Sequence, residues 1–176
     1  MPQPDSAKQY PSSVIIVFCF IRRGDELLLV ERALPPYQGM RTIPGGHKQY
    51  GEELAAACLR EMKEETGLSL HDCHLAGVMQ VRQEGRTGPE ALCVYFVSEE
   101  FSGDVAPSIE GKLAWLKTAE IYKDKGVHPA LRALLPHIES GNYPFTAEAD
   151  VDADGKGKYT VTSPGKRGKS VTRRHE

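Results

Sequence analysis

The chain has 176 residues, of which 40% are apolar and 26% charged, and its formal net charge is −2. This length and composition predict one globular domain, and they exclude collagen-like, wholly disordered and membrane-embedded proteins. The charge is uneven, because residues 164–176 hold five Lys or Arg against one Glu and leave the rest of the chain at −6. Such an acidic body repels phosphates, so a general nucleic-acid binder is not expected.

Residues 1–11 are expected to form a flexible leader, 12–162 a single domain, and 163–176 a basic, flexible tail. Strands are predicted at 14–21, 26–30, 41–44, 75–83, 92–99 and 113–116, helices at 53–66 and 128–140, and a hairpin over 143–162. Mixed strands with two main helices indicate one domain of the α/β or α+β class.

The longest apolar run, residues 14–21, is too short to span a bilayer, and no membrane association is expected. Two arginines follow it directly and no small-residue cleavage site is present, which disfavours a signal peptide. Its β-branched and aromatic residues favour a buried strand. Four scattered cysteines without a C-x-x-C pair are typical of reduced thiols, mostly in the core of a cytoplasmic protein: Cys19, Cys58, Cys73 and Cys93.

Each predicted helix has apolar residues at spacings of three and four, which indicate one buried face. In the first helix these residues are Ala55, Cys58, Leu59 and Met62, and in the second they are Leu131, Leu134, Leu135 and Ile138. Gly67 is predicted to end the first helix, because glycine accepts the left-handed conformation common at that position.

Three carboxylates crowd another side of the first helix. Glu61, Glu64 and Glu65 fall within an arc about 100° wide, since each helical residue turns by about 100°. Like charges at these spacings repel one another, so helix stability alone does not explain them. Oxygen clusters of this kind suit Mg²⁺ or Mn²⁺, with substrate phosphates completing the coordination. The alternative is a solvated acidic face paired with Arg60 and Lys63.

The surrounding residues favour the metal site. A Gly45-Gly46 pair lets backbone approach a ligand closely, and Glu52 is placed to hold Arg60. Residues 46–68 resemble the Nudix box, G-x5-E-x7-R-E-U-x-E-E-x-G-U, where U is a bulky aliphatic residue. Every defined position is matched: Gly46, Glu52, Arg60, Glu61, Met62, Glu64, Glu65, Gly67 and Leu68.

The order of the predicted elements resembles a whole Nudix domain over roughly residues 12–140. The resemblance implies a mixed β-sheet sandwiched between helices, and a hydrolase that cleaves nucleoside diphosphate derivatives. Glu61, Glu64 and Glu65 would be metal ligands, with the carbonyl of Gly45 beside them. Mg²⁺ is the expected cofactor and Mn²⁺ its substitute. Glu52 would orient Arg60, and the Gly46 backbone would approach the substrate.

Three positions outside the box match the family less closely. Arg32 resembles the arginine that grips substrate phosphates in MutT-type enzymes, although an exposed strand-end arginine is the alternative. Glu110 resembles a loop glutamate that approaches the metals in this family; the alternative is an acidic residue of a surface loop without a role in catalysis. The general base would be Glu64 or Glu110. His128 lies where these enzymes often place base-reading groups, against a simple helix cap.

The stretch 101–116 and the late hairpin are similar to bacterial MutT-type 8-oxo-dGTP diphosphatases. A (d)NTP, cleaved to NMP and pyrophosphate, is therefore the expected substrate, with ADP-ribose or another nucleotide-sugar second. Two alternatives are more remote. One is a non-catalytic Nudix-like sensor, and the other is an RNA-directed decapping hydrolase, a hypothesis supported only by the basic tail. The expected partner is a small nucleotide, and a homodimer stays open.

Two other metal motifs are rejected. Residues 150–155 imitate the start of an EF-hand loop, but Val161 stands at its twelfth position, where a bidentate Glu is required. His71, Cys73 and His74 could suggest zinc, but no second ligand pair stands at a suitable spacing.

Overall fold

The computed structural model describes residues 13–85, 90–163 and 171–174. The expected leader lies outside these residues, as do 164–170 and 175–176 of the expected tail. The elements are β1 (Ser13–Arg23), β2 (Glu26–Arg32), β3 (Arg41–Thr42), β4 (Gly45–His47), α1 (Leu54–Thr66), β5 (Ser69–Leu70), β6 (His74–Gln83), β7 (Glu90–Ser98), β8 (Phe101–Ser102), β9 (Gly111–Lys117), α2 (Thr118–Ile121), α3 (Pro129–Glu139), β10 (Phe145–Val151), β11 (Gly157–Thr162) and β12 (Val171–Arg174).

The apolar run near the start of the chain forms the central strand β1. Val17, Cys19 and Ile21 are buried in one core cluster, whereas Phe20 is buried in the other. A strand covered on both faces reads as a continuous apolar run rather than an alternating one. The predicted β1–β2 hairpin is present but short, because β1 pairs with β2 only through its last two residues and runs parallel to β7 before that.

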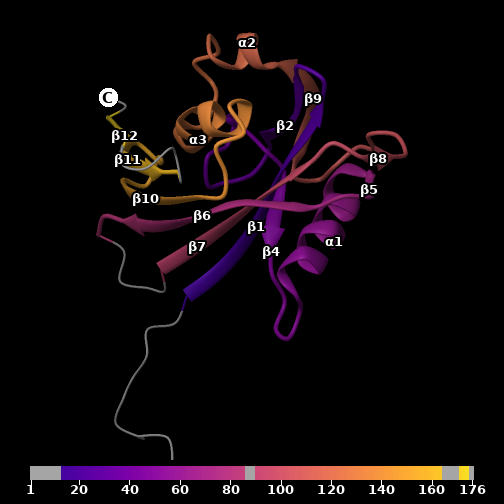
Figure 1. Cartoon of the computed structure of the whole chain (residues 1–176), viewed down its shortest axis with the longest axis horizontal. Helices are drawn as coiled ribbons and strands as arrows, with labels where there is room; N and C mark the ends of the chain where they lie inside the picture. Colours follow the sequence, from indigo (N-terminus) through magenta and orange to yellow (C-terminus); the bar gives the residue numbers. More distant parts are fainter. Residues whose placement is uncertain (1–12, 86–89, 164–170, 175–176) are drawn as a thin grey trace, which may run out of the picture.

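The main sheet follows the order β12-β11-β10-β6-β7-β1-β2-β3, with β4 added to β1 and β9 to β2. Parallel pairs (β1 with β7, β6 with β10) alternate with antiparallel ones, so the sheet is mixed. The helices α1 and α3 cover opposite faces of the central strands (Figure 1). The predicted α+β class, with a mixed sheet between helices, is confirmed.

The face that α1 buries differs from the predicted one. Cys58 and Met62 are fully buried as expected, but Leu59 is 38% exposed, and Ala57 and Glu61 are buried in its place. The helix is turned so that the side of Glu61 packs against β4, which the apolar spacing alone does not reveal. In α3 all four predicted core residues are buried, and Gly67 ends α1 in the left-handed conformation with φ 80°.

The predicted C-terminal hairpin is formed by β10 and β11, and it joins the sheet through parallel pairing of β10 with β6. The backbone of Val171–Arg174, within the segment expected to be a tail, pairs with β11 as β12. All four cysteines are free thiols, and all except Cys73 are buried. Within the described ranges, no helix is both long and apolar enough to span a bilayer.

Candidate active site

Strand β4 brings the glycine pair against the flank of α1. Gly45 and Gly46 pair with residues of β1, and the amide of Gly45 donates a hydrogen bond to Oε2 of Glu65 at 3.1 Å. A Cβ atom on Gly46 would lie only 2.1 Å from Oε2 of Glu61. The missing side chain therefore makes the room that the Glu61 carboxylate occupies, and the fold brings the glycine pair together with two of the three candidate ligands.

Arg60 connects the remaining box residues. Its Nε and Nη2 donate to the two carboxylate oxygens of Glu52 at 2.8 and 2.9 Å, in the fork geometry that arginine and carboxylate share. Its Nη1 donates to Glu61 at 2.7 Å and to Glu64 at 3.1 Å, and its Nη2 also reaches the carbonyl of His47. The Arg60 guanidinium, helped by the amide of Gln49, lowers the pKa of Glu52 to about 2.

We expect Glu52→Gln to cause a partial loss of activity. Glutamine cannot accept both charge-assisted bonds from Arg60, so the loop before α1 would be held less firmly. Metal affinity should weaken by about tenfold or more, as outer-sphere changes commonly do. Isothermal titration with Mn²⁺ and kcat/KM would measure this, with Glu53→Gln as the matched control, since Glu53 is exposed and makes no side-chain cap bond. A loss as large as that of Glu65→Gln would mean that Glu52 touches metal or substrate directly.

Glu65 is half-buried on the inner side of α1. Burial raises its pKa to about 7, and the nearby carboxylates of Glu110 and Glu61 add to this, while the Gly45 amide and Arg32 act against it. Arg32 and Glu110 therefore lie within electrostatic range of the box helix, although they come from β2 and the loop before β9. The pairing of β2 with β9 places Arg32 opposite Gly111, and Nη2 of Arg32 lies 3.9 Å from Oε2 of Glu110.

The donor set of this site suits a cation. Among the described residues, no three His, Cys, Asp or Glu side chains are grouped as they would be around a metal ion. Instead, one nitrogen of Arg60 lies between the carboxylates of Glu61 and Glu64. Two carboxylates thus already converge on one cationic group, and their hard oxygen atoms are of the kind that Mg²⁺ and Mn²⁺ prefer.

His128 lies apart from the carboxylates, at the N-cap of α3. Its Nδ1 accepts a hydrogen bond from the amide of Ala130 at 3.2 Å, so the helix-cap role is present. Its ring meets the edge of Tyr37, with centroids 4.4 Å apart, and Gly155 at the tip of the β10–β11 hairpin lies against it. Burial, followed by the charge of Arg32, lowers the pKa of His128 to about 4. No sequence pattern predicts Tyr37 or Gly155 here, because nothing in their spacing relates them to His128.

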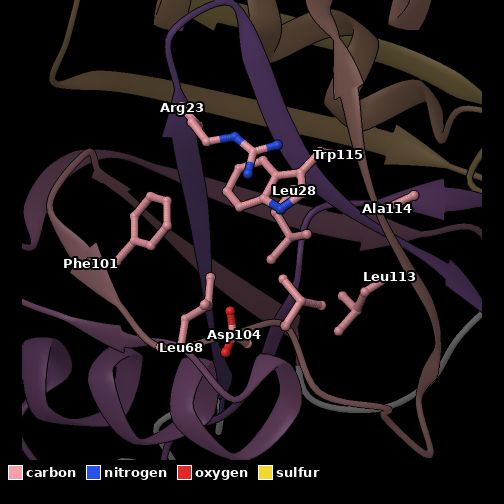
Figure 2. Close-up of a pocket in the computed structure, with 10 residues that line it drawn as sticks. Arg23, Leu28, Leu68, Phe101, Asp104, Leu113, Ala114 and Trp115 are labelled. Atoms are coloured by element: carbon pink, nitrogen blue, oxygen red, sulfur yellow. The ribbon is translucent and has the colours of Figure 1, made fainter.

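A surface cavity of about 360 Å³ lies between β1, β8 and β9, and its wall includes Leu28 and Leu68 (Figure 2). It contains none of the box carboxylates. Trp115 already stacks on Phe101, with centroids 5.5 Å apart, and carries the Arg23 guanidinium 4.3 Å from its ring centroid. Its aromatic surface is thus used by intramolecular contacts, and the candidate site is the box helix with its neighbours.

Comparison with known proteins agrees with this geometry. The NUDIX domain family model matches residues 12–138. An uncharacterized Nudix hydrolase, YvcI of Bacillus subtilis, is 31% identical over 100 residues, which cover 55% of this chain and 61% of that protein. An ADP-ribose pyrophosphatase of Methanocaldococcus jannaschii is 29% identical over 105 residues, which cover 60% of this chain and 62% of that protein. The matched segments therefore span about three-fifths of these two relatives.

A crystal structure of the MutT protein from Bacillus halodurans has the same fold. It superposes with a TM-score of 0.75 at 24% identity, and the match covers 84% of this chain and 97% of that one. The family model spans more than half of the chain and coincides with the complete box around α1. The chain therefore belongs to the Nudix family.

Proposed function

We propose that this chain is a metal-dependent pyrophosphohydrolase that cleaves a (d)NTP, such as 8-oxo-dGTP, to the nucleoside monophosphate and pyrophosphate. The observation that carries this proposal is that Arg32 and Glu110, 3.9 Å apart, lie within electrostatic range of the half-buried Glu65 of the box helix. A cation-binding helix and a phosphate-binding arginine on one site suit a polyphosphate, because both oppose its negative charge.

Glu61, Glu64 and Glu65 would hold Mg²⁺, or Mn²⁺ in its place, with the Gly45 carbonyl beside them. When bound, the divalent cation supplies neutralisation of phosphate charge and a lower pKa for water. The chain supplies the positioning: Arg60 holds two of the three carboxylates, and Glu52 holds Arg60.

Glu110 is the proton acceptor in this proposal. Water attacks phosphorus, its proton passes to the Glu110 carboxylate, and the bond to the leaving phosphate oxygen breaks. Its support is that Glu110 lies beside Arg32, the proposed phosphate-binding residue, and in electrostatic range of Glu65, a proposed metal ligand. Glu64, the other candidate base, has a 58% exposed side chain and is paired with Arg60.

A substrate panel tests the proposal. Canonical and oxidised (d)NTPs, ADP-ribose and dinucleoside polyphosphates would be incubated with Mg²⁺ and, separately, with Mn²⁺, and the products separated by ion-exchange chromatography. We expect the highest kcat/KM with a triphosphate, together with pyrophosphate release and no turnover in EDTA. Hydrolysis of no panel compound would overturn the proposal.

ADP-ribose is the second candidate substrate. The observation in its favour is the similarity to the Methanocaldococcus jannaschii protein, whose name is ADP-ribose pyrophosphatase. A kcat/KM for ADP-ribose above that of every triphosphate would establish this alternative and leave the same residues in the same roles.

Arg32→Ala is expected to raise KM and to change kcat little. Arginine can donate two parallel bonds to phosphate oxygens, and bonds that only hold the substrate exist equally in ground and transition states. The effect should be larger for a triphosphate than for ADP-ribose if Arg32 reaches the terminal phosphates. Arg32→Lys should restore only part of the affinity, since it has a point charge and no fork.

The matched control for Arg32 is Arg22→Ala, because Arg22 lies near the end of β1 and pairs with Glu99 at 2.8 Å. Steady-state kinetics on the panel would compare the two variants. Equal behaviour of Arg32→Ala and Arg22→Ala would make Arg32 an ordinary strand-end arginine.

A further inference from the structure

Three of the four cysteines lie together on the buried side of the box helix. Cys19 is in the middle of β1, Cys58 is in α1, and Cys73 is in the connection between β5 and β6. Cys19 and Cys58 are buried in one core cluster, and Cys73 packs against it. The thiol of Cys58 is hydrogen-bonded to those of Cys19 and Cys73. The fold thus brings together three sulfur atoms from distant segments, whereas Cys93 is buried in the other core cluster.

The connection that carries Cys73 is held in place by the residue before it. The carboxylate of Asp72 accepts hydrogen bonds from the hydroxyl of Ser98 at 2.6 Å and from two backbone amides of the turn between β7 and β8. The residue after Cys73, His74, begins β6 and pairs with β7. Because both neighbours of Cys73 are anchored to the same strand, its backbone is fixed at the position from which its thiol meets Cys58.

The three thiols differ in their access to solvent. Cys19 and Cys58 are 0% exposed, whereas Cys73 is half-buried, so an oxidant in solution would meet Cys73 first. The hydrogen bond to Cys58, together with burial, raises the pKa of Cys73, and the nearby carboxylates of Asp72 and Glu53 add to this. Because the thiolate is the reactive form of cysteine, we expect the attack to be slow at neutral pH.

We propose that Cys73 and Cys58 form a reversible oxidation site, at which hydrogen peroxide converts the two thiols into a disulfide that ties α1 to the β5–β6 connection. The thiolate of Cys73 attacks one peroxide oxygen and the O–O bond breaks. A sulfenic acid forms, and the other oxygen leaves as hydroxide, which takes up the proton that the Cys73 thiol released. The sulfur of Cys58 then attacks the sulfenic sulfur, and the S–O bond breaks. Hydroxide leaves and becomes water with the proton of Cys58. The two thiols lose two electrons and two protons, and the peroxide is reduced to two molecules of water.

The contact between the two thiols makes the second step intramolecular. Groups held together react as though at very high concentration, so Cys58 captures the sulfenic acid before a second peroxide can oxidise it further. A dithiol reductant reopens the resulting disulfide, whereas a sulfinic acid would be irreversible. The bond also closes a loop in the chain, which disfavours the unfolded state. Neither nucleotide nor divalent cation takes part, so a failure of the proposed function leaves this inference unaffected.

Peptide mapping after oxidation tests the site. The full chain would be kept for several hours in EDTA with a small molar excess of hydrogen peroxide, alkylated to block free thiols, and digested without reductant. We expect a linked peptide pair that contains Cys58 and Cys73 and that dithiothreitol separates, while Cys19 and Cys93 stay free. The oxidised protein should melt several degrees above the reduced one. Absence of this pair, or an oxidised protein that melts below the reduced one, would overturn the proposal.

Cys58→Ala and Cys73→Ala test the separate roles of the two thiols. Without Cys58, peroxide should carry Cys73 to a sulfinic acid that dithiothreitol does not reverse. This variant also removes the contact that contributes most to the raised pKa of Cys73, so the attack should not become slower. In Cys73→Ala, Cys58 should stay reduced, and a disulfide between Cys19 and Cys58 there would overturn the role of Cys73.

Cys93→Ala is the matched control, because Cys93 is also a buried thiol but belongs to the other core cluster. It should form the same linked pair as the wild type and reopen equally with dithiothreitol. Loss of the pair in this variant would mean that Cys93 takes part, and would overturn the assignment to Cys58 and Cys73. The wild-type map and Cys73→Ala decide the proposal even where Cys58→Ala, which leaves a small cavity in the core, does not fold.

Discussion

Glu65→Gln is expected to remove at least about 99% of turnover and to leave the fold intact, since loss of a main electrostatic element costs about a hundredfold or more. Glutamine has nearly the same shape and can still accept the bond from the Gly45 amide. It carries no charge with which to hold a divalent cation. Steady-state kinetics on the substrate panel would measure the loss, with Glu120→Gln on α2 as an exposed control. Near wild-type rates on every panel compound would contradict the assignment of α1 as the metal helix.

The same variant should be more stable than the wild type in EDTA at high pH. Burial raises the pKa of Glu65 to about 7, above the ordinary value of 4.5 that an unfolded chain would show. Between these two values the unfolded chain releases a proton that the folded chain retains, so wild-type stability falls as pH rises through this window. Melting temperatures should therefore agree near pH 4, and Glu65→Gln should melt several degrees higher at pH 8. Equal melting temperatures at both pH values would contradict a pKa of Glu65 that burial raises in the folded protein.

Gly46→Ala and Gly45→Ala should fail in opposite ways. At Gly46 the new methyl group would meet the Glu61 carboxylate, which is the mobile end of a flexible side chain. The carboxylate can move aside, so stability should change little while kcat/KM falls by about a hundredfold. At Gly45 the methyl group would lie 2.5 Å from the backbone oxygen of Val17 and 2.3 Å from the Phe18 ring. Strand β1 cannot yield there, so this variant should lose about 1–3 kcal/mol of stability.

Circular dichroism melts together with kcat/KM would separate the two glycine variants, and each serves as the control for the other. Wild-type turnover by Gly46→Ala would show that the position of the Glu61 carboxylate is unimportant. A Gly45→Ala protein that melts with the wild type would mean that β1 and β4 can separate at no cost.

The parts of the fold that depend on local chemistry could be predicted from the sequence. The spacing of apolar residues predicted which face of α3 is buried, and Gly67 predicted where α1 ends. Both properties follow from the geometry of a single segment. The rotation of α1 could not be predicted in this way. Leu59 is exposed and Glu61 buried because β4 packs on that flank, and this contact belongs to the tertiary structure.

The candidate site divides along the same line. The spacing of Glu61, Glu64 and Glu65 places them together on any helix, whereas the approach of Arg32 and Glu110 depends on how β2 pairs with β9. The contact of Gly155 with His128 depends on the β10–β11 hairpin, which joins the sheet through the pairing of β10 with β6. No sequence motif predicts this contact. Arg32 and Glu110 could be named in advance only through the resemblance to the family, because nothing in the spacing of these two residues shows that they meet.

The bonds of Arg60 change what loading a metal would mean for this protein. Its guanidinium is an internal counter-ion that already pairs with Glu52, Glu61 and Glu64 and offsets part of their charge. Binding a divalent cation is then an ion exchange, in which the incoming charge competes with a tethered one for two of these carboxylates. The measured affinity for the metal would then reflect how much more strongly the carboxylates bind the divalent cation than the Arg60 guanidinium. It would be lower than the affinity of carboxylates that have no such partner. Because these ion pairs already hold the carboxylates in place, we expect the domain to fold without the metal, unlike small domains whose ligands are held together only by the ion.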